Sequence, residues 1–537
     1  MNNQLNRRSF FGLSVAATAA AALAACAPNA PAARKTNRIM PGDPSIARYE
    51  SRRASTGATV RQKLSPGAFT TTLAGKSITT WGYNGSLAAP VIRGKVGDQL
   101  DATVVNGLKD GTSIHWHGLA LRNNDDGVPN VTQQAIAAGA SYNYSFKLPH
   151  PGTYWYHSHV EMQRERALYG ALIIEDPNEP LSYDKDWVIV LDDWIDGLDG
   201  TPGDVLKGLS RGMTGMAGMS GMGQSSSPPS SAMASMSGMD MGSGAPMSSA
   251  SPSAGGMSGG YMLMGARSDF LGGDAGDVKY PVHLFNGKTP ERPETFDAKP
   301  GERVRLRIIN AAGDTAYRVG VPGQKITLTH TDGFPVVHKE VDAVVLGMGE
   351  RIDALLTVRD GYTPVLALAE GKGQRSYGLV STGTGTAPAM AGLPARLEGT
   401  VVDSGQLTAD PAVVLPSKTP DRVHALHLTG GMGMYDWGIN GHRFDMTTPF
   451  ANAFEVKIGE RVEVKFINDT DMWHPMHIHG HTFQVGESGA RKDTVIVRPK
   501  QSVTVRFDAD NPGQWLTHCH NAYHAERGMM GVFSYTT

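Results

Sequence analysis

Three segments of the chain alternate apolar and polar residues over about ten positions, each beginning with glycine and ending with asparagine. They are residues 97–106, 301–310 and 459–468. Because side chains alternate between the two faces of a β-strand, each segment predicts a half-buried strand. An Asn-Gly pair, which favours a tight two-residue turn, precedes each of them: Asn84-Gly85, Asn286-Gly287 and Asn440-Gly441.

The spacing of these segments predicts three related domains. Consecutive copies begin 204 and 158 residues apart, and the longer step contains a low-complexity insert of roughly 50 residues. Further alternating stretches at 142–148 and 503–507, together with 65 glycines, favour an all-β protein rich in turns. We expect the domains to occupy residues 61–180, 181–400 and 401–537.

Ten of the 18 histidines fall in four short segments of the first and third domains. The pairs in His115-Trp116-His117 and His157-Ser158-His159 recur 362 and 361 residues later in His477-Ile478-His479 and His518-Cys519-His520. A single His-X-His pair indicates a metal only weakly, but four pairs in a repeated frame are not a chance arrangement. If the two domains face each other, eight imidazoles meet at one interface, a number that suits about three copper ions.

A second kind of metal site is indicated near the C-terminus. On a strand Cys519 points away from His518 and His520, because successive side chains alternate faces. His524 and Met529 follow within eleven residues of His518, and His474 lies upstream in the same domain. A thiolate, two imidazoles and a weak thioether are the ligands of a blue-copper centre. One strand would then connect two metal sites.

These motifs together resemble the three-domain multicopper oxidases, which include laccases and bacterial copper-resistance oxidases. The resemblance runs from about residue 60 to the end and implies an all-β chain of three cupredoxin domains, each a Greek-key sandwich or barrel. It implies four copper ions and four one-electron oxidations of substrate, coupled to reduction of O2 to two waters. The type 1 copper implied would be held by His474, Cys519, His524 and axial Met529. The type 2 copper would be held by His115 and His477, and the type 3 pair by His117, His157 and His520 on one ion and His159, His479 and His518 on the other.

Protons must also reach the site where O2 is reduced. Asp126 matches the family's aspartate near the type 2 copper, which implies a proton relay; the alternative is a turn aspartate before Gly127. Several family members carry glutamate directly after the second type 1 histidine. Here Ala525 takes that place and Glu526 follows, so a second proton route is not predicted.

The N-terminus has the pattern of a targeting segment. Residues 1–26 contain Arg7-Arg8 in a twin-arginine frame, an apolar run, and a lipobox-like end at Leu23-Ala24-Ala25-Cys26. We expect export to the periplasm or cell envelope and a lipid anchor on Cys26, the alternative being ordinary cleavage slightly downstream. Residues 27–60 are expected to form a polar tether. Cys519 is the only other cysteine, so the mature chain can form no internal disulfide.

The insert, residues 208–260, consists largely of Gly, Ser, Pro and Met, and twelve of the 24 methionines fall between Met213 and Met264. Such a composition predicts disorder. Thioethers select Cu(I), so the segment is expected to gather that ion; the alternative is a simple linker. Met472 matches a methionine near type 1 in copper-resistance members of the family, and Asp471 lies one place from the position of their acidic partner, which implies a substrate-copper site there.

These observations leave three functions open. The first is an exported cuprous oxidase of copper tolerance with laccase-like side activity. The second is a laccase acting mainly on phenols or aryl amines, and the third is a copper-sequestering protein with incidental turnover. The net charge of −2 gives no support for nucleic-acid binding, and we expect a monomer whose partners are O2 and Cu(I) or small aromatic reductants.

Overall fold

The three alternating segments are strands in the computed structural model, which describes residues 37–217, 260–263 and 265–537. They form β5 (Gln99–Val105), β15 (Arg303–Asn310) and β27 (Arg461–Asn468). The Asn-Gly turns have both residues at positive φ, as in Asn84 (55°) and Gly85 (70°), which is the type I′ geometry. β5 is half-buried as predicted, but β15 is buried on both faces, because Arg305 and Arg307 on its outer face form buried ion pairs with Asp353.

The first domain packs two small sheets, of order β1-β5-β7 and β4-β9-β8-β6, with a β2-β3 hairpin at its side. Its other elements are β1 (Thr59–Leu64), β2 (Pro66–Leu73), β3 (Lys76–Tyr83), β4 (Ile92–Lys95), β6 (His115–His117), η1 (Asn123–Asp125), β7 (Ser141–Lys147), β8 (Gly152–His157), η2 (Glu161–Glu165) and β9 (Tyr169–Glu175).

The middle domain packs two six-stranded sheets, β13-β10-β15-β20-β17-β18 and β14-β22-β21-β16-β19-β23. Its other elements are β10 (Lys185–Trp194), α3 (Pro202–Ala217), β11 (Arg267–Ser268), β12 (Gly273–Asp274), β13 (Val282–Phe285), β14 (Thr295–Asp297), β16 (Tyr317–Gly320), β17 (Ile326–Thr331), β18 (Phe334–Val341), β19 (Ala343–Leu346), β20 (Arg351–Thr357), β21 (Tyr362–Ala369), β22 (Arg375–Ser381), η4 (Met390–Gly392), β23 (Val401–Asp403), η5 (Ser404–Gln406) and η6 (Pro411–Val413). The predicted boundary at residue 400 is slightly too early, because β23 pairs with β19 in this domain.

The third domain packs a six-stranded sheet, β25-β24-β27-β32-β29-β30, on a five-stranded one, β26-β34-β33-β28-β31. Its other elements are β24 (Arg422–Gly431), β25 (Asp436–Ile439), β26 (Phe454–Val456), β28 (His474–Ile478), β29 (Phe483–Val485), β30 (Arg491–Lys492), β31 (Thr494–Val497), β32 (Ser502–Asp508), β33 (Gln514–Cys519), α4 (Ala522–Glu526) and β34 (Met530–Tyr535).

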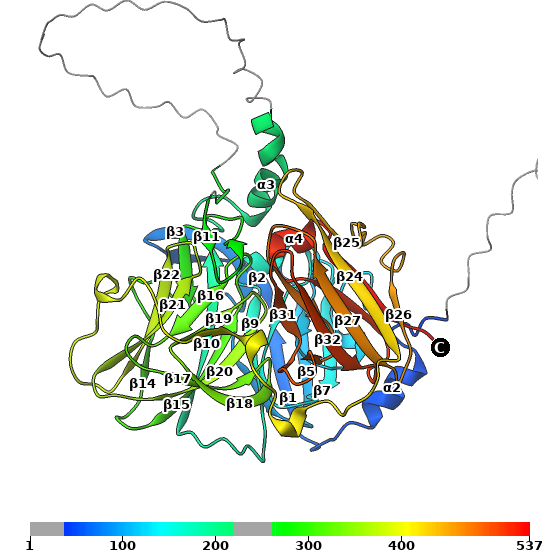
Figure 1. Cartoon of the computed structure of the whole chain (residues 1–537), viewed down its shortest axis with the longest axis horizontal. Coiled ribbons are helices and arrows are strands. Elements are labelled where there is room, and N and C mark those ends of the chain that lie inside the picture. Colours follow the sequence, from blue (N-terminus) through cyan, green and yellow to red (C-terminus); the bar gives the residue numbers. More distant parts are fainter. Residues whose placement is uncertain (1–36, 218–259, 264) are drawn as a thin grey trace, which may run out of the picture.

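The domains share apolar cores, which fixes the first and third domains against each other. One continuous cluster of buried residues includes Trp116 and Tyr156 from the first domain and Trp437 and Trp515 from the third. Figure 1 shows the middle domain, green to yellow, on the left and the third domain, orange to red, on the right. Burial of large aromatic side chains on this scale is the main favourable contribution to association of the domains.

The predicted tether is wrong for residues 37–60, which fold against the domains. The N–H of Ile39 donates to the carbonyl of Tyr535 (2.9 Å), and Asp43 caps α2 (Pro44–Ser51), which buries Ile46. The segment is polar on average, but its few apolar side chains are enough to bind it to the domains. The twin-arginine motif and Cys26 lie outside the described residues. Within the described part of the chain, no helix is long and apolar enough to cross a membrane.

The predicted disorder of residues 208–260 is wrong for its first part, because α3 continues to Ala217. Val205 and Leu209, one helical turn apart, are buried in the core shared with Tyr280. Full burial of such a side chain contributes about 1.5–3 kcal/mol to folding stability. The surrounding glycines and serines gave a composition that did not predict this burial. Residues 218–259 lie outside the described part.

Candidate metal centres

One sulfur and two nitrogen atoms form a triangle in the third domain, where β28, β33 and α4 meet. Sγ of Cys519 lies 3.6 Å from Nδ1 of His474 and 3.7 Å from Nδ1 of His524, and the two nitrogens are 3.1 Å apart. All three side chains are fully buried. His474 begins β28, Cys519 ends β33, and Asn521 caps α4 by accepting the N–H of His524. A single copper ion fits a thiolate and two imidazoles in this arrangement.

Met529 is fully buried next to this triangle. Its N–H donates to the carbonyl of His524 (3.1 Å), and its own carbonyl accepts the N–H of Cys519 (3.0 Å). The turn after α4 therefore ties the predicted axial residue to two members of the triangle. A weak thioether in this position is typical of blue-copper sites.

Asp277 of the middle domain contacts the triangle, and no sequence motif indicates this residue. Its Oδ2 atom lies 3.0 Å from Nε2 of His524 and accepts a hydrogen bond from the hydroxyl of Tyr435 (2.6 Å). Trp437 covers the His524 ring, with 4.1 Å between ring centroids. A carboxylate on the far nitrogen of a metal-binding histidine fixes its ring and raises its basicity. No motif surrounds Asp277, so only the packing of two domains identifies it.

The charged surroundings of His524 also differ from those of the other histidines. Burial alone would lower the pKa of His524, but Asp277 and the Cys519 sulfur raise this pKa to about 10. For His474, which has no carboxylate partner, burial and the neighbouring His524 lower the pKa well below its usual value. The His524 imidazole is thus held by a carboxylate and strongly basic, whereas the His474 imidazole is weakly basic, and both would face the same ion.

Eight histidines from the first and third domains converge on one buried interface. They fall into three sets whose nitrogen atoms lie within 4.8 Å of one another. The sets are His115, His117 and His477; His117, His157 and His520; and His159, His479 and His518. Each set combines residues of both domains, so neither domain alone can form the cluster.

Strand pairing explains how each domain presents its histidines. In the first domain His115 lies opposite His157 on β6 and β8, and in the third His477 lies opposite His518 on β28 and β33. The two halves then stack across the interface. The centroids of the His115 and His479 rings are 3.7 Å apart, and those of His117 and His477 are 3.8 Å apart.

Ring nitrogens of this cluster are buried without a hydrogen-bond partner in the described structure. They are Nε2 of His115, His157, His159 and His477, Nδ1 of His117, and both nitrogens of His520. The opposite nitrogen is often held by a backbone carbonyl, as for Nδ1 of His115 on Asp126 (2.9 Å) and Nδ1 of His157 on Ser158 (2.9 Å). Metal-binding histidines have this arrangement, with one nitrogen held by protein and the other left for the metal. The residues therefore fit copper.

The protonation state of these rings suits the same role. Burial lowers the pKa of His157, His159, His518 and His520 well below the usual range, and neighbouring histidines and Arg164 lower it further. Rings that stay neutral keep a lone pair for a metal ion.

Asp126, the predicted proton relay, lies between two of the cluster histidines. Its Oδ2 atom is 3.0 Å from Nδ1 of His479, its Oδ1 atom is 3.2 Å from Nδ1 of His115, and the side chain is fully buried. The residue follows η1 as its C-cap, and the chain turns at the next residue, Gly127 (φ 79°). A carboxylate in this position can hold or move a proton next to both rings.

Asp493 and Arg351 also support the cluster, and sequence reasoning missed both. Oδ1 of Asp493 lies 3.0 Å from Nε2 of His117, and its carbonyl lies 2.8 Å from Nδ1 of His477. Burial alone would raise the pKa of Asp493, but the guanidinium of Arg351, 2.6–2.7 Å away, holds it well below its usual range. The charged run Arg491-Lys492-Asp493 inside an apolar strand region was the available signal.

A cavity of about 260 Å³ between the first and third domains reaches His159 of the cluster. Its walls include His159, Met446, Ala525 and Glu526. Ala525 carries no acid, as the sequence indicates, but the Glu526 carboxyl adjoins the same space. Burial raises the pKa of Glu526 to about 7, against the opposing effect of Arg164.

The predicted substrate-copper pair, Met472 and Asp471, is not brought together. The Met472 side chain is buried in the core (4% exposed), whereas the Asp471 carboxylate is 91% exposed and pairs with Lys500 at 3.0 Å. The two residues lie in a bend between β27 and β28, where one side chain faces the interior and the other the solvent.

Comparison with known proteins agrees with this geometry. Residues 68–179, 267–374 and 417–537 each match a family model described as multicopper oxidase. Multicopper oxidase MmcO of Mycobacterium tuberculosis is 39% identical, over 99% of this chain and 97% of its own. Copper resistance protein A of Escherichia coli is 28% identical, over 83% of this chain and 87% of its own.

Solved structures show the same fold. Fet3p, a multicopper oxidase that functions in iron import, superimposes with a TM-score of 0.70 at 21% identity, covering 89% of this chain and 90% of its own. A laccase from Botrytis aclada superimposes with a TM-score of 0.69 at 22% identity, covering 90% of this chain and 89% of its own. The predicted architecture of three cupredoxin domains is confirmed, and the chain belongs to the multicopper oxidase family, whose members are copper-containing oxidoreductases that use O2 as acceptor.

Proposed function

We propose that the chain binds four copper ions and is an exported cuprous oxidase of copper tolerance. The type 1 ion would be held by His474, Cys519, His524 and Met529. The type 2 ion would be held by His115 and His477, and the type 3 ions by His117, His157 and His520 and by His159, His479 and His518. The unpartnered buried ring nitrogens of the histidine cluster are the observation that carries the assignment of copper there. Copper bound there would supply one-electron oxidation at the first site and reduction of O2 to water at the second.

The chain itself links the two sites and supplies protons. Cys519, the last residue of β33, is bonded through the backbone to His518 and His520, so the triangle and the cluster are joined through adjacent residues. Asp126, between His115 and His479, would hold and deliver a proton at its carboxylate. The cavity beside His159 would admit O2 and release water.

Enclosure of His524 favours a small reductant over a bulky one. The His524 ring is fully buried, and Trp437, Tyr435 and Asp277 occupy the space around it. A phenol cannot stack directly on such a ring. Electrons from Cu(I) held nearby need only a short path, so the packing supports a cuprous substrate.

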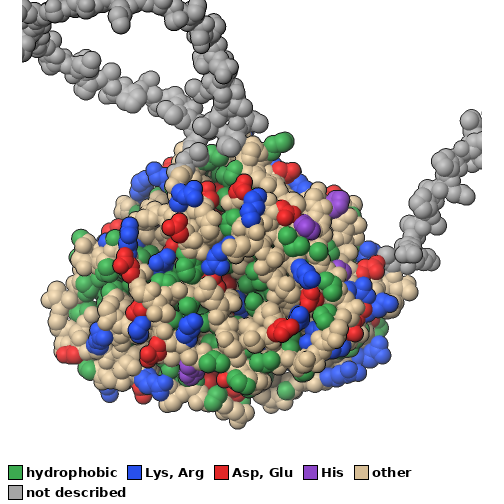
Figure 2. Space-filling view, in the orientation of Figure 1, with side chains coloured by type: hydrophobic (Ala, Val, Ile, Leu, Met, Phe, Trp, Pro, Cys, Tyr) green, Lys and Arg blue, Asp and Glu red, His purple; other side chains and the backbone are tan. Residues whose placement is uncertain are grey.

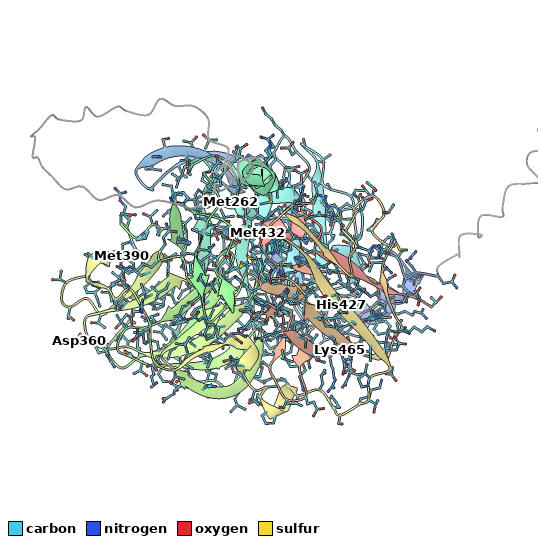
Figure 3. All side chains as sticks on the ribbon, turned by 45° about the horizontal axis from the view of Figure 1, so that its top comes forward. Met262, Asp360, Met390, His427, Met432 and Lys465 are labelled. Carbon is cyan, nitrogen blue, oxygen red and sulfur yellow. The ribbon has the colours of Figure 1, made fainter. Side chains whose placement is uncertain are left out.

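Methionines on the same side of the molecule support this substrate class. Met262 and Met432 are half-buried against the core that contains Cys519 and Met529, and Figure 3 labels both on the side where α3 lies. Thioethers are soft ligands that select Cu(I). The names of relatives, among them copper resistance protein A, point the same way. Export by the twin-arginine route, a lipid anchor on Cys26 and a monomeric state complete the proposal.

The methionine segment gives the deciding experiment. Replacing the methionines between 219 and 257 by serine, at unchanged length, should lower Cu(I) oxidation at limiting copper by about tenfold, because the local concentration of the ion falls. Oxidation of a small phenol, measured in parallel, should not change. A matched variant in which serines of the same segment become threonine controls for altered chain properties.

Each other outcome has a definite meaning. If Cu(I) oxidation is unaffected, the segment is a linker and the laccase function is the better conclusion. If both substrates lose activity equally, the variant is damaged, and the melting temperature will show it. If copper stays bound to the segment without being oxidised, the protein sequesters copper.

The Asp277 carboxylate leads to a second prediction. Asp277→Asn removes the negative charge next to the far nitrogen of His524. Without this charge, Cu(II) is stabilised less than in the parent protein. We expect the reduction potential of the blue copper to rise by roughly 60 mV, the value of a tenfold one-electron change. Spectroelectrochemical titration measures it. Asp269→Asn, an exposed change of the same charge in the same segment, should leave the potential unchanged.

A further inference from the structure

Positive charge is concentrated at the start of the folded chain. Residues 37–64 contain six Lys and Arg and two Asp and Glu, a local charge of +4, whereas the whole chain has −2. The six are Arg38, Arg48, Arg52, Arg53, Arg61 and Lys63. An excess of this size within 28 residues makes the start of the folded chain more basic than the chain as a whole.

Two elements present four of these side chains to solvent. Arg48 and Arg52 lie one turn apart at the end of α2, on the side away from the buried Ile46. Arg61 and Lys63 alternate outward on β1, where both are exposed.

The acids nearest to them have their closest contacts with other groups. Glu50 pairs with Arg53 at 2.8 Å and also accepts the N–H of Lys147. Asp43 caps α2 through the N–H of Ser45. Asp101 lies in register with Arg61 and accepts the hydroxyl of Ser145.

None of the four cationic side chains forms a salt bridge with a described residue. Arg52 has a different contact, with its guanidinium 5.1 Å from the centre of the Tyr49 ring. Met40, just before α2, adds a partly exposed apolar side chain (39%) to the same corner.

The pictures place this corner away from the proposed copper-oxidising end. Figure 2 shows Lys and Arg side chains gathered along the lower right edge, where Figure 1 draws α2. α4, which carries His524, lies near the top of the same view. A surface bound at α2 would therefore leave the type 1 side turned outward.

We propose that the end of α2 and the outer face of β1, with Arg48, Arg52, Arg61 and Lys63, form a docking surface for an anionic lipid membrane. A membrane is inferred as the partner because of the short distance along the chain to Cys26, and this inference rests on the proposed lipid anchor there. Asn37 follows Cys26 by eleven positions, so a fully extended chain between the two spans no more than about 40 Å. An acyl chain in the bilayer keeps this face within reach of the headgroups, and basic residues reinforce an acyl anchor on anionic lipid.

The surface is tested without the anchor, using copper-loaded protein that begins at residue 27. It should co-sediment with vesicles of equal parts phosphatidylglycerol and phosphatidylcholine at low salt. Binding should disappear with phosphatidylcholine alone, and should weaken strongly at high salt because the charges are screened. Changing Arg48, Arg52, Arg61 and Lys63 to Gln should weaken binding at least about tenfold.

A second variant separates a specific surface from bulk charge. Lys288, Arg292, Lys299 and Arg303 are four exposed cations of the middle domain, and changing them to Gln alters the net charge equally. This control should bind vesicles like the parent protein, and both variants should keep their visible absorption.

Three results would overturn the proposal: no binding at low salt, equal binding to neutral vesicles, or equal loss in both variants. Mass spectrometry of membrane-extracted protein tests lipidation of Cys26 separately. Failure of that assay would leave the vesicle result standing, and failure of the vesicle assay would leave the anchor standing.

Discussion

A Cys519→Ser variant should lose the blue absorption and all turnover while still folding. The Cys519 sulfur lies 3.6 and 3.7 Å from the two imidazole nitrogens, and a hard hydroxyl cannot replace a soft thiolate in binding and charge transfer to copper. Loss of a contact that orients a metal ligand lowers metal affinity or activity roughly 10–100-fold, so loss of the ligand itself should lower activity further. Visible spectroscopy and oxygen uptake measure the two effects.

The copper content of the same variant provides its internal control. His518 and His520 are unchanged, so the cluster should still load and about three coppers per chain should remain. Ser534→Ala, a change at a buried residue of β34, should keep the blue colour and activity. A blue, active serine variant would refute the type 1 assignment.

Much of the site could be predicted because it depends on short-range geometry. Alternation along a strand puts Cys519 on one side and His518 and His520 on the other. The offsets of 362 and 361 residues mark a repeated unit, and related units that face each other bring their histidines together. The same regularity predicted the strands β5, β15 and β27 and their turns.

The residues that were missed come from contacts between domains. Asp277 reaches His524 from the middle domain, and Arg351 reaches Asp493 from the same domain. Neither belongs to a motif, and no local pattern predicts which segments of two domains meet. Such positions follow only from the packed structure.

The errors on the tether and the insert have one physical cause. Composition averages over many residues, whereas docking depends on a few apolar side chains in the right places. Ile46 on α2 and Leu209 on α3 are buried, and each is surrounded in sequence by polar or small residues. The exposed Asp471 beside the buried Met472 shows the converse error, in which neighbours in sequence were assumed to share a site.

A His115→Ala variant should remove the type 2 copper although most of the cluster remains. His115 and His477 come from different domains, and their nitrogen atoms fall in one set within 4.8 Å. The His115 ring also stacks on His479 at 3.7 Å. We expect the type 2 signal in electron paramagnetic resonance to disappear and oxygen uptake to fall by more than about 100-fold. Reduction of the blue copper under anaerobic conditions should persist, because the Cys519 triangle is untouched.

His481 offers a matched control in the same segment as His477 and His479. It is buried, but its Nε2 atom is 2.7 Å from the hydroxyl of Tyr535 and it belongs to none of the three sets. His481→Gln should therefore keep the type 2 signal and the full copper content. If it loses the signal as His115→Ala does, the loss reflects general damage. If His115→Ala keeps all its copper and normal oxygen uptake, the two domains do not share the ion, and the assignment of the interdomain cluster is wrong.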